Sequence, residues 1–165
     1  MKAIKPESIE ENIFNLIAKD WFLVTAGTEK SFNTMTAGWG GFGVLWNKKV
    51  CFIYIRSTRY TFEFLEKNET FTLSFFGSGH RKMLNYCGSH SGREVDKAKE
   101  TGLTPVITEN GSVYFGEARL VIECKKIYTQ DLDPGAFLDP GIEKNYPQKD
   151  YHRLYVGEIL QCLGG

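Results

Sequence analysis

Residues Val50–Glu63 read VCFIYIRSTRYTFE. The first part, Val50–Ile55, is apolar and rich in β-branched and aromatic side chains, which is typical of a strand buried on at least one face. From Thr58 to Asn68, side chains of similar character recur four residues apart, which indicates a short helix. The stretch therefore predicts a buried strand that leads through a short turn into the start of a helix.

The turn between these two elements carries an unusual set of donors. It consists of Arg56, Ser57, Thr58, Arg59, Tyr60 and Thr61. Two guanidinium groups, three hydroxyls and the free N–H groups of a helix start would converge there, a combination that suits a phosphate monoester. The same pattern also fits a solvated loop that caps a helix, with both arginines in water.

Composition narrows the class of protein. With 165 residues and 42% hydrophobic content, the chain is expected to form one globular domain over residues 1–165 with a sizeable core. Lys plus Arg and Asp plus Glu are 20 each, and this balance argues against a nucleic-acid-binding surface. The aromatic content of 14% fits a β-rich core or a site for a planar ligand.

The four cysteines are far apart in the sequence and form no CxxC pair, so no metal site is expected. Cys51 and Cys124 lie in apolar runs and are expected to be buried. The N-terminal residues include no apolar signal region, and no stretch reaches the roughly 18 apolar residues of a membrane span. No membrane association is expected, and a cytoplasmic location is the default.

Strand-like runs dominate the chain, with short helices between them and no regular strand–helix alternation. The expected strands are Trp21–Ala26, Asn33–Phe42, Val50–Ile55, Phe71–Phe76, Val106–Thr108, Ser112–Ile122 and Tyr151–Leu160. The expected helices begin at Ser8, where Ser8 and Glu11 are spaced as a capping box, and cover Thr58–Asn68, Arg81–Tyr86 and Val95–Thr101. Asp131–Gln148 holds three of the five prolines and is expected to be a long loop. The pattern favours a mainly β, antiparallel barrel with a few short helices.

Asn33–Trp39, which reads NTMTAGW, is an odd strand. It places amide, hydroxyl and small side chains where a core strand would hold large aliphatic ones. Small side chains allow a ligand to approach the backbone, and Asn33, Thr34 and Thr36 offer hydrogen bonds. By itself, the segment fits equally well a half-exposed strand with its threonines in water.

Together, the two segments follow a recognisable order: N-x-M-T-A-x-W, a short gap, an apolar strand, then R-S-T-R-Y-T. This order resembles the flavin reductase-like family of FMN-binding split β-barrels, which includes the flavoredoxins. The resemblance extends to LVTAG at Leu23–Gly27, SGREVDK at Ser91–Lys97 and HRLYVGE at His152–Glu158. It implies an antiparallel split β-barrel of the FMN-binding type.

The resemblance also implies which residues hold the cofactor. The first segment would run along the flavin ring and ribityl chain, with Asn33, Thr34, Met35, Thr36, Ala37 and Trp39 as its contacts. The turn would hold the phosphate through Arg56, Ser57, Thr58, Arg59 and Thr61, with Tyr60 close by. No catalytic acid, base or nucleophile is required, because hydride transfer is the chemistry of the cofactor.

Four further residues are less clearly marked by the pattern. His90, in a polar Gly-rich loop, could face the flavin or an incoming nicotinamide, or simply be solvated. His152 starts the last strand and matches a family position near the flavin site. Asp96 and Lys97 are expected on a solvated helix face.

The predicted function is reduction of FMN by NADH or NADPH, with electrons passed to a flavin or a protein acceptor, in a homodimer that the resemblance implies. A first alternative is a non-enzymatic electron carrier of the flavoredoxin type that lacks a nicotinamide site. A second is a β-barrel module that binds another phosphorylated planar ligand. The run Gly38–Gly43 matches GxGxxG but precedes no helix of a βαβ unit, so a dinucleotide-binding fold is rejected.

Overall fold

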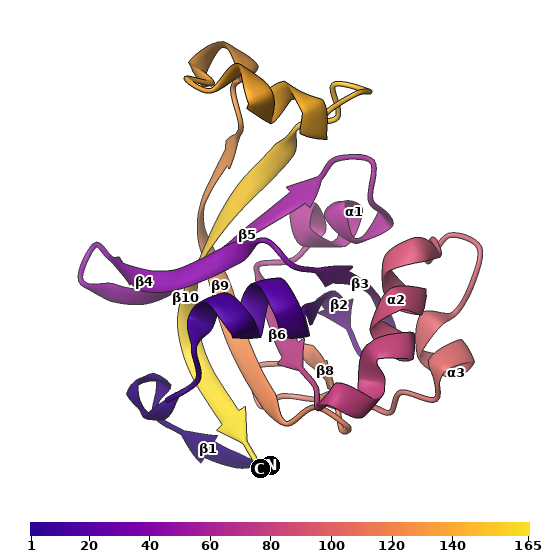
Figure 1. The fold of residues 1–165 in the computed structure, drawn as a ribbon. Helices are drawn as coiled ribbons and strands as arrows, with labels where there is room; N and C mark the ends of the chain where they lie inside the picture. Colours follow the sequence, from indigo (N-terminus) through magenta and orange to yellow (C-terminus); the bar gives the residue numbers. More distant parts are fainter.

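Ten β-strands form most of the architecture in the computed structural model, which describes residues 1–165 (Figure 1). They are β1 (Lys2–Ile4), β2 (Phe22–Thr28), β3 (Ser31–Ala37), β4 (Gly40–Leu45), β5 (Lys48–Arg56), β6 (Thr70–Phe75), β7 (Pro105–Ile107), β8 (Val113–Phe115), β9 (Leu120–Asp131) and β10 (His152–Gly164). The α-helices are α1 (Tyr60–Lys67), α2 (Arg81–Ser89) and α3 (Lys97–Thr101). Shorter or wider helical turns are η1 (Pro6–Ser8), η2 (Asn15–Asp20), η3 (Ser78–His80), η4 (Pro134–Ala136) and η5 (Pro140–Asn145).

Eight strands form one antiparallel sheet in the order β3-β2-β6-β9-β10-β5-β4, with β1 paired to β10. β7 and β8 form a separate hairpin. The two ends of the sheet, β3 and β4, are consecutive in the chain but do not pair with each other. The sheet therefore curves into a barrel that stays open between these strands, and the predicted mainly β, antiparallel architecture is confirmed.

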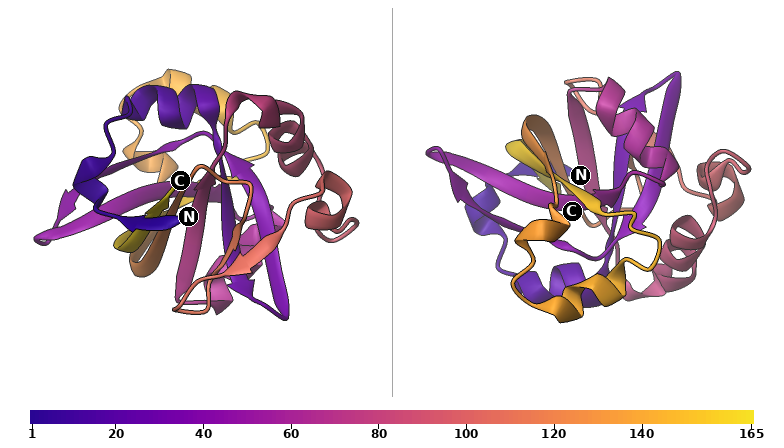
Figure 2. Two further views of the ribbon diagram at one scale, coloured as in Figure 1. Left: turned by 90° about the horizontal axis from the view of Figure 1, so that it is seen from below. Right: turned by 90° about the horizontal axis from the view of Figure 1, so that it is seen from above.

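The barrel interior holds the main hydrophobic core. Its largest side chains include Phe22, Phe71, Phe75 and Tyr155, all essentially inaccessible to solvent. A second cluster, which includes Leu84 and Phe115, packs α2 and α3 against the outside of the sheet. Figure 2 shows these helices on the side of the barrel opposite the β4–β5 hairpin. The burial of this large apolar surface is the main stabilising contribution to the fold.

The N-terminal helix starts later than the sequence predicts. Ser8 does not act as a cap: its hydroxyl donates to the carbonyl of Lys5, and the helix begins at Ile13 and continues as the π-helical turn η2. The side chain of Asn12 accepts a hydrogen bond from the N–H of Asn15 instead. The capping-box prediction is therefore wrong, because these local bonds satisfy the backbone in another way.

The run Asn33–Phe42, predicted as one strand, is two strands. β3 ends at Ala37, and β4 begins at Gly40, where φ is +158°. A Cβ atom at Gly40 would lie 2.5 Å from the carbonyl oxygen of Phe52, so glycine allows the two backbones to approach here. The break at Gly38–Trp39 opens the barrel.

The connection between β9 and β10 (residues 132–151), predicted as a loop, contains the short helices η4 and η5 and projects beyond one end of the barrel (Figure 1). Three aromatic rings, Phe137, Tyr146 and Tyr151, pack on one another within it. This connection therefore has a small core of its own next to the start of β10. None of the helices combines the length and apolar composition that a membrane span requires.

Candidate functional site

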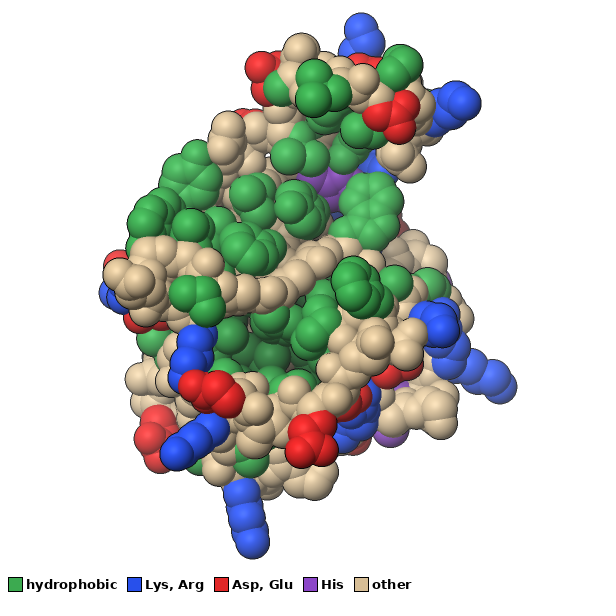
Figure 3. Space-filling model, turned by 60° about the vertical axis from the view of Figure 1, so that its left-hand side comes forward, with side chains coloured by type: hydrophobic (Ala, Val, Ile, Leu, Met, Phe, Trp, Pro, Cys, Tyr) green, Lys and Arg blue, Asp and Glu red, His purple; other side chains and the backbone are tan.

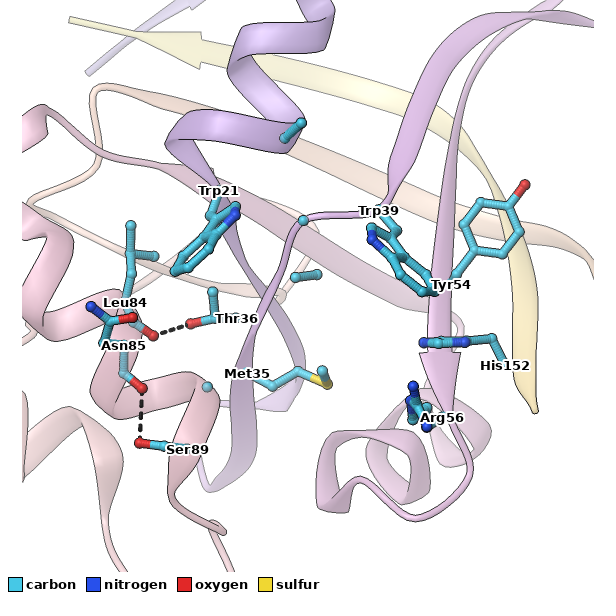
Figure 4. Close-up of a pocket in the computed structure, with 14 residues that line it drawn as sticks. Trp21, Met35, Thr36, Trp39, Tyr54, Arg56, Leu84, Asn85, Ser89 and His152 are labelled. Carbon is cyan, nitrogen blue, oxygen red and sulfur yellow. Dashed lines mark hydrogen bonds between the residues drawn. The ribbon is translucent and has the colours of Figure 1, made fainter. Parts of the chain in front are cut away.

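A pocket of about 590 Å³ opens along β3, between η2 and α2 on one side and β5 and β10 on the other (Figure 4). We call it the wide pocket. It is lined by Ala18, Trp21, Met35, Thr36, Ala37, Gly38, Trp39, Tyr54, Arg56, Leu84, Asn85, Gly88, Ser89 and His152. Trp21 and Trp39 lie on either side of it, and the thin strand end from Met35 to Gly38 passes between them (Figure 4).

A smaller pocket of about 120 Å³ adjoins the wide pocket, and we call it the narrow pocket. Met35 and Ser89 line both pockets. The other residues of the narrow pocket are Thr58, Arg59, Tyr60, Thr61, His90, Ser91, Gly92 and Lys97. The two pockets are therefore adjacent, one aromatic and the other rich in hydroxyl groups and cations.

Two of the predicted ring contacts have other partners in the structure. Asn33 is buried, and its amide donates to the hydroxyl of Thr61 at 2.7 Å, which ties β3 to the first turn of α1. Thr34 is buried too and bonds within the sheet to the carbonyl of Val24 and the hydroxyl of Thr25. Neither side chain lines the wide or the narrow pocket.

The other four predicted ring contacts, Met35, Thr36, Ala37 and Trp39, line the wide pocket. The hydroxyl of Thr36 donates to the carbonyl of Leu84 at 2.5 Å, so it fixes α2 beside β3 (Figure 4). Met35 and Ala37 are buried with only a small exposed surface, and Trp39 is 49% exposed. The backbone of β3 is therefore accessible to a flat ligand on the pocket side.

The two arginines of the turn lie in different pockets. Arg56, at the end of β5, donates to Asp150 at 2.7 Å and to the carbonyl of Asn145, and it stacks on the ring of Tyr146. Arg59 lies in the narrow pocket and donates to the carbonyl of Gly88 at 2.6 Å. The expected convergence of both guanidinium groups on one spot is therefore not seen.

Arg59 has the surroundings of an anion-binding group. Burial, and to a smaller extent the charge of Arg56, lower the pKa of Arg59 from its ordinary value. It remains charged, because an arginine pKa starts far above neutral. None of the ion pairs in the structure includes Arg59.

The remaining turn residues surround Arg59 to different degrees. Thr58 and Tyr60 line the narrow pocket, and Tyr60 packs edge-to-face on Phe64. Thr61 lines it as well, although its hydroxyl accepts the amide of Asn33. Ser57 is exposed and lines neither pocket.

His152 is buried where β10 begins, in the wall of the wide pocket. Its Nδ1 is hydrogen-bonded to the hydroxyl of Tyr146 at 2.8 Å, and its ring lies 4.9 Å from that of Trp39. Burial, with a contribution from the guanidinium of Arg56, lowers the pKa of His152 to about 4. At neutral pH the pocket wall therefore presents an uncharged imidazole.

His90, by contrast, lies at the mouth of the narrow pocket. It stacks on Tyr86 with ring centroids 3.9 Å apart, and its Nδ1 lies near the hydroxyl of Ser89. Its side chain is exposed. The structure thus places it beside the polar compartment and away from the aromatic one.

Trp21 and Tyr54 line the wide pocket but were not named as site residues by the sequence analysis, and Lys97 was expected on a solvated helix face. Trp21 has a φ of +62°, which is rare for a residue with a side chain, and its ring lies under the guanidinium of Arg81 at 3.5 Å. Tyr54 lines the wide pocket from β5. The prediction that Lys97 is solvated is wrong: only 5% of it is exposed. A positively charged residue in a short polar helix gave no sequence signal for burial.

The chain matches the model of the flavin reductase-like domain over residues 14–164. The chain belongs to this family. The match includes every residue of both pockets. The predicted family is therefore confirmed, and the domain is one of a family of flavin-related redox proteins. No curated protein sequence matches the chain.

Solved structures with the same fold have been determined for other organisms. A flavoredoxin from Methanosarcina acetivorans is 24% identical, with a TM-score of 0.69 over 88% of this chain and 68% of that chain. An FMN-binding protein from Thermus thermophilus, solved with p-hydroxybenzaldehyde, is 21% identical, with a TM-score of 0.70 over 100% of this chain and 82% of that chain. An NADH:FAD oxidoreductase from Streptomyces globisporus is 19% identical, with a TM-score of 0.68 over 88% and 75%. These likenesses confirm the split-barrel fold.

The site of this flavin reductase-like domain fits a flavin mononucleotide in its shape and donors. The wide pocket has the aromatic and thin-stranded walls that suit a flat ring system. The narrow pocket offers a guanidinium, the hydroxyl of Thr58 just before α1, and the hydroxyl of Ser91 just after α2, which suit a phosphate. The shared residues Met35 and Ser89 lie where a connecting chain would pass.

Proposed function

We propose that this flavin reductase-like domain binds FMN in the two joined pockets and moves electrons from NADH or NADPH through FMN to a flavin or a protein acceptor. One observation carries the proposal: the aromatic wide pocket adjoins the narrow pocket, where the half-buried cation Arg59 lies without a carboxylate partner. The order of these compartments matches the order of ring and phosphate in FMN.

The residues of the wide pocket would position the ring. Backbone groups of Met35–Gly38 and the amide of Asn85 lie along one side, and Trp21 and Trp39 limit the slot at its two sides. The neutral imidazole of His152 adds no positive charge that would oppose the cationic nicotinamide left when the donor gives up its hydride. A bound flavin would supply the redox chemistry, since its ring accepts a hydride and passes electrons on.

The turn residues would hold the phosphate. Arg59 and the hydroxyl of Thr58 face the narrow pocket, and the first turn of α1 begins at Tyr60 with N–H groups that lack intrahelical partners. Arg56 takes a different part in this proposal. Through Asp150 and Asn145 it holds the β9–β10 connection at the rim of the wide pocket.

The purified protein tests the proposal. We expect a yellow protein, or a colourless one that binds added FMN, whose flavin absorbance bleaches rapidly on anaerobic mixing with NADH or NADPH. Arg59→Ala is expected to weaken FMN binding by roughly 1.5–3 kcal/mol, because a charge-assisted contact to phosphate is lost. Lys144→Ala, an exposed cation on η5, is the matched control and should leave the affinity unchanged.

Two outcomes would contradict parts of the proposal. If FMN binds but stays oxidised with both nicotinamides, the domain is an electron carrier of the flavoredoxin type. If the protein ignores FMN, the pockets serve another phosphorylated planar ligand.

We further propose that the domain acts as a homodimer. The face around β4 exposes large apolar side chains: Phe14, Trp39, Val44 and Trp46 are 49–82% exposed. Figure 3 shows hydrophobic side chains gathered on this face and a hollow among them. The hollow, about 540 Å³, is lined by Ile13, Phe14, Ile17, Phe42 and their neighbours, and it shares Gly38 and Trp39 with the wide pocket. An apolar surface of this kind is typical of a protein–protein interface.

A further inference from the structure

Trp21 and Arg81 form a fixed pair at the edge of the wide pocket. The indole of Trp21 lines this pocket, and the guanidinium of Arg81 lies over it, 3.5 Å from the ring centroid. A Cβ atom at Gly38 would lie 2.8 Å from Cδ1 of the indole, so the ring also packs on the backbone just after β3. Trp21 keeps this place with a φ of +62°, which costs free energy in a residue with a side chain. The chain therefore holds the indole, and the cation over it, at the rim of the pocket.

The charge of Arg81 is fixed in position but is not neutralised. One of its N–H groups donates to the carbonyl of Lys19 at 2.6 Å. None of the ion pairs in the structure includes Arg81 or Lys19. A guanidinium has five N–H donors, so most of those of Arg81 remain available. Both side chains are exposed, and an anion from solution can reach them.

A third pocket, of about 290 Å³, adjoins the wide pocket beside this pair, and we call it the outer pocket. Leu84 lines both the wide and the outer pocket. The other residues of the outer pocket are Lys19, Asp20, Phe76, Gly77, Ser78, Arg81 and Arg119. Arg119 is paired with Asp20 and with Glu11, so the charges of Lys19 and Arg81 have no match. The outer pocket is therefore positively charged and lies next to the aromatic compartment.

We propose that the outer pocket binds the diphosphate group of the nicotinamide dinucleotide donor, with Arg81 and Lys19 as its contacts. This inference rests on the proposed function, because it takes NADH or NADPH as the molecule that reduces the flavin. The two donors share the diphosphate, so the contact is common to both. Arg81 and Lys19 act as binding residues and take no part in the hydride transfer.

The arrangement of the three pockets limits where the anionic part of the donor can lie. In the proposed function the narrow pocket holds the flavin phosphate, so the diphosphate of the donor must lie elsewhere. One ribose joins the nicotinamide to the diphosphate, which therefore lies beside the wide pocket when the nicotinamide is inside it. At the other rim of the wide pocket, Arg56 is already paired with Asp150. The unpaired guanidinium of Arg81 offers forked donors that match phosphate oxygens.

The test uses the FMN-loaded protein and two kinds of hydride donor. NADH and NADPH carry the diphosphate, whereas N-benzyldihydronicotinamide has the same reducing ring and no phosphate. Anaerobic stopped-flow mixing at several donor concentrations gives the Kd of each donor and the limiting rate of flavin bleaching. Arg81→Ala should raise the Kd of NADH and of NADPH roughly 5- to 20-fold, because a charge-assisted contact at an exposed site is lost. The limiting rates and the Kd of the benzyl donor should stay unchanged.

A binding measurement tests the same contact without turnover. ADP-ribose, which has the diphosphate and no nicotinamide, is titrated calorimetrically into the FMN-loaded protein. It should bind wild type, and more weakly Arg81→Ala and Lys19→Ala. The affinity for wild type should fall as ionic strength rises, because both contacts are exposed charges. Lys82→Ala is the matched control, since Lys82 is the next exposed cation on α2 and lines neither the wide nor the outer pocket. It should leave every Kd unchanged.

Three results would overturn this inference alone. The same Kd of NADH in Arg81→Ala as in Lys82→Ala would remove the outer pocket from the donor site. An equal loss of affinity for NADH and for the benzyl donor would assign Arg81 a structural role, the placement of Trp21. A loss confined to NADPH would assign the pocket to the additional phosphate of that donor. A protein that does not bind FMN, or bound FMN that stays oxidised with both nicotinamides, would overturn the proposed function and the inference with it.

Discussion

At the scale of single residues, His152 couples the start of β10 to the wall of the wide pocket and to the β9–β10 connection. Its imidazole is bonded to Tyr146 and packed on Trp39, with Arg56 nearby. Burial and the positive charge of Arg56 favour the neutral ring, and together they outweigh the charge of Asp150, which favours the imidazolium. Protonation of His152 would therefore disturb three elements at once.

This arrangement predicts an acid-sensitive stability. The pKa of His152 is about 4 in the folded protein and about 6.5 in the unfolded chain, so the unfolded chain binds the proton more readily. The stability that the neutral His152 gives the folded protein is fully present above pH 6.5 and is lost as pH falls from 6.5 to 4. In urea unfolding, wild type should lose on the order of 2 kcal/mol more than His152→Gln over this range.

The comparison with His152→Gln removes the contribution of carboxylates, which titrate in the same range in both proteins. Parallel stability curves for the two proteins would contradict the neutral, buried imidazole. His80→Gln, a change at a half-buried histidine that does not line the wide pocket, is the control and should behave as wild type.

At this scale, the sequence predicted which residues lie at the site. Met35, Thr36, Ala37, Trp39, Arg59 and His152 were all named from their order in the chain, and the structure places them around the two pockets. The partners of a side chain were not predictable. Arg56 has the same local pattern as Arg59, but Asp150, which lies 94 residues further along, pairs with it.

At the scale of elements, strand β10 depends on a close contact at Gly157. A Cβ atom here would lie 2.7 Å from the ring of Phe71 and 2.8 Å from the Cβ of Cys124. The pairing of β10 with β9 is irregular directly before this glycine. The absence of a side chain allows the Phe71 ring to lie against the strand inside the core.

Gly157→Ala is therefore expected to destabilise the barrel by about 1–3 kcal/mol, as overpacking of a filled core does. Gly41→Ala is the matched control on β4: its nearest neighbour would be 3.8 Å away, so its stability should change by less than about 1 kcal/mol. Denaturant unfolding measures both. Equal stability of the two variants would contradict this prediction, because it would show that the core rearranges to accommodate the extra methyl group.

Most strands and the helices α1, α2 and α3 were predictable, because each has its own apolar pattern or turn signal. The break between β3 and β4 was not predicted, although Gly38–Gly43 holds four glycines, because glycines alone do not show where one strand ends and the next begins. The position of the break depends on the close contact between the backbones of Gly40 and Phe52, which lie on different strands. At Ser8, a competing local hydrogen bond to the carbonyl of Lys5 replaces the capping pattern.

At the scale of the whole molecule, the proposed homodimer makes its own prediction. Phe14 is 82% exposed at the edge of the apolar hollow. Phe14→Asp should convert a dimer into a monomer, because it places a charge in the centre of a dry interface. Light scattering coupled to size exclusion measures the mass directly.

Ile107→Asp is the control for this change. Ile107 is exposed as well, at 37%, but it lies on the β7–β8 hairpin outside the apolar face. It should leave the mass unchanged. A wild-type protein that runs as a monomer at all concentrations would contradict the homodimer, without bearing on the flavin site.

The overall architecture was predictable because several short segments occur in one order along the chain, and that order specifies both the barrel and its family. The two pockets could not be predicted from the sequence, because each is formed by elements that are distant in the chain. Trp21, Tyr54 and Lys97 come from three different elements and meet only in the folded chain.

The position of β10 in the sheet has a consequence for biosynthesis. This strand is the last of the ten to leave the ribosome, yet it pairs with β1, β5 and β9. Until it emerges, β5 and β9 each present an open edge, and such edges attract other extended chains. An unfinished chain therefore exposes an unpaired edge on β5 and on β9, and the barrel closes only after β10 has been synthesised.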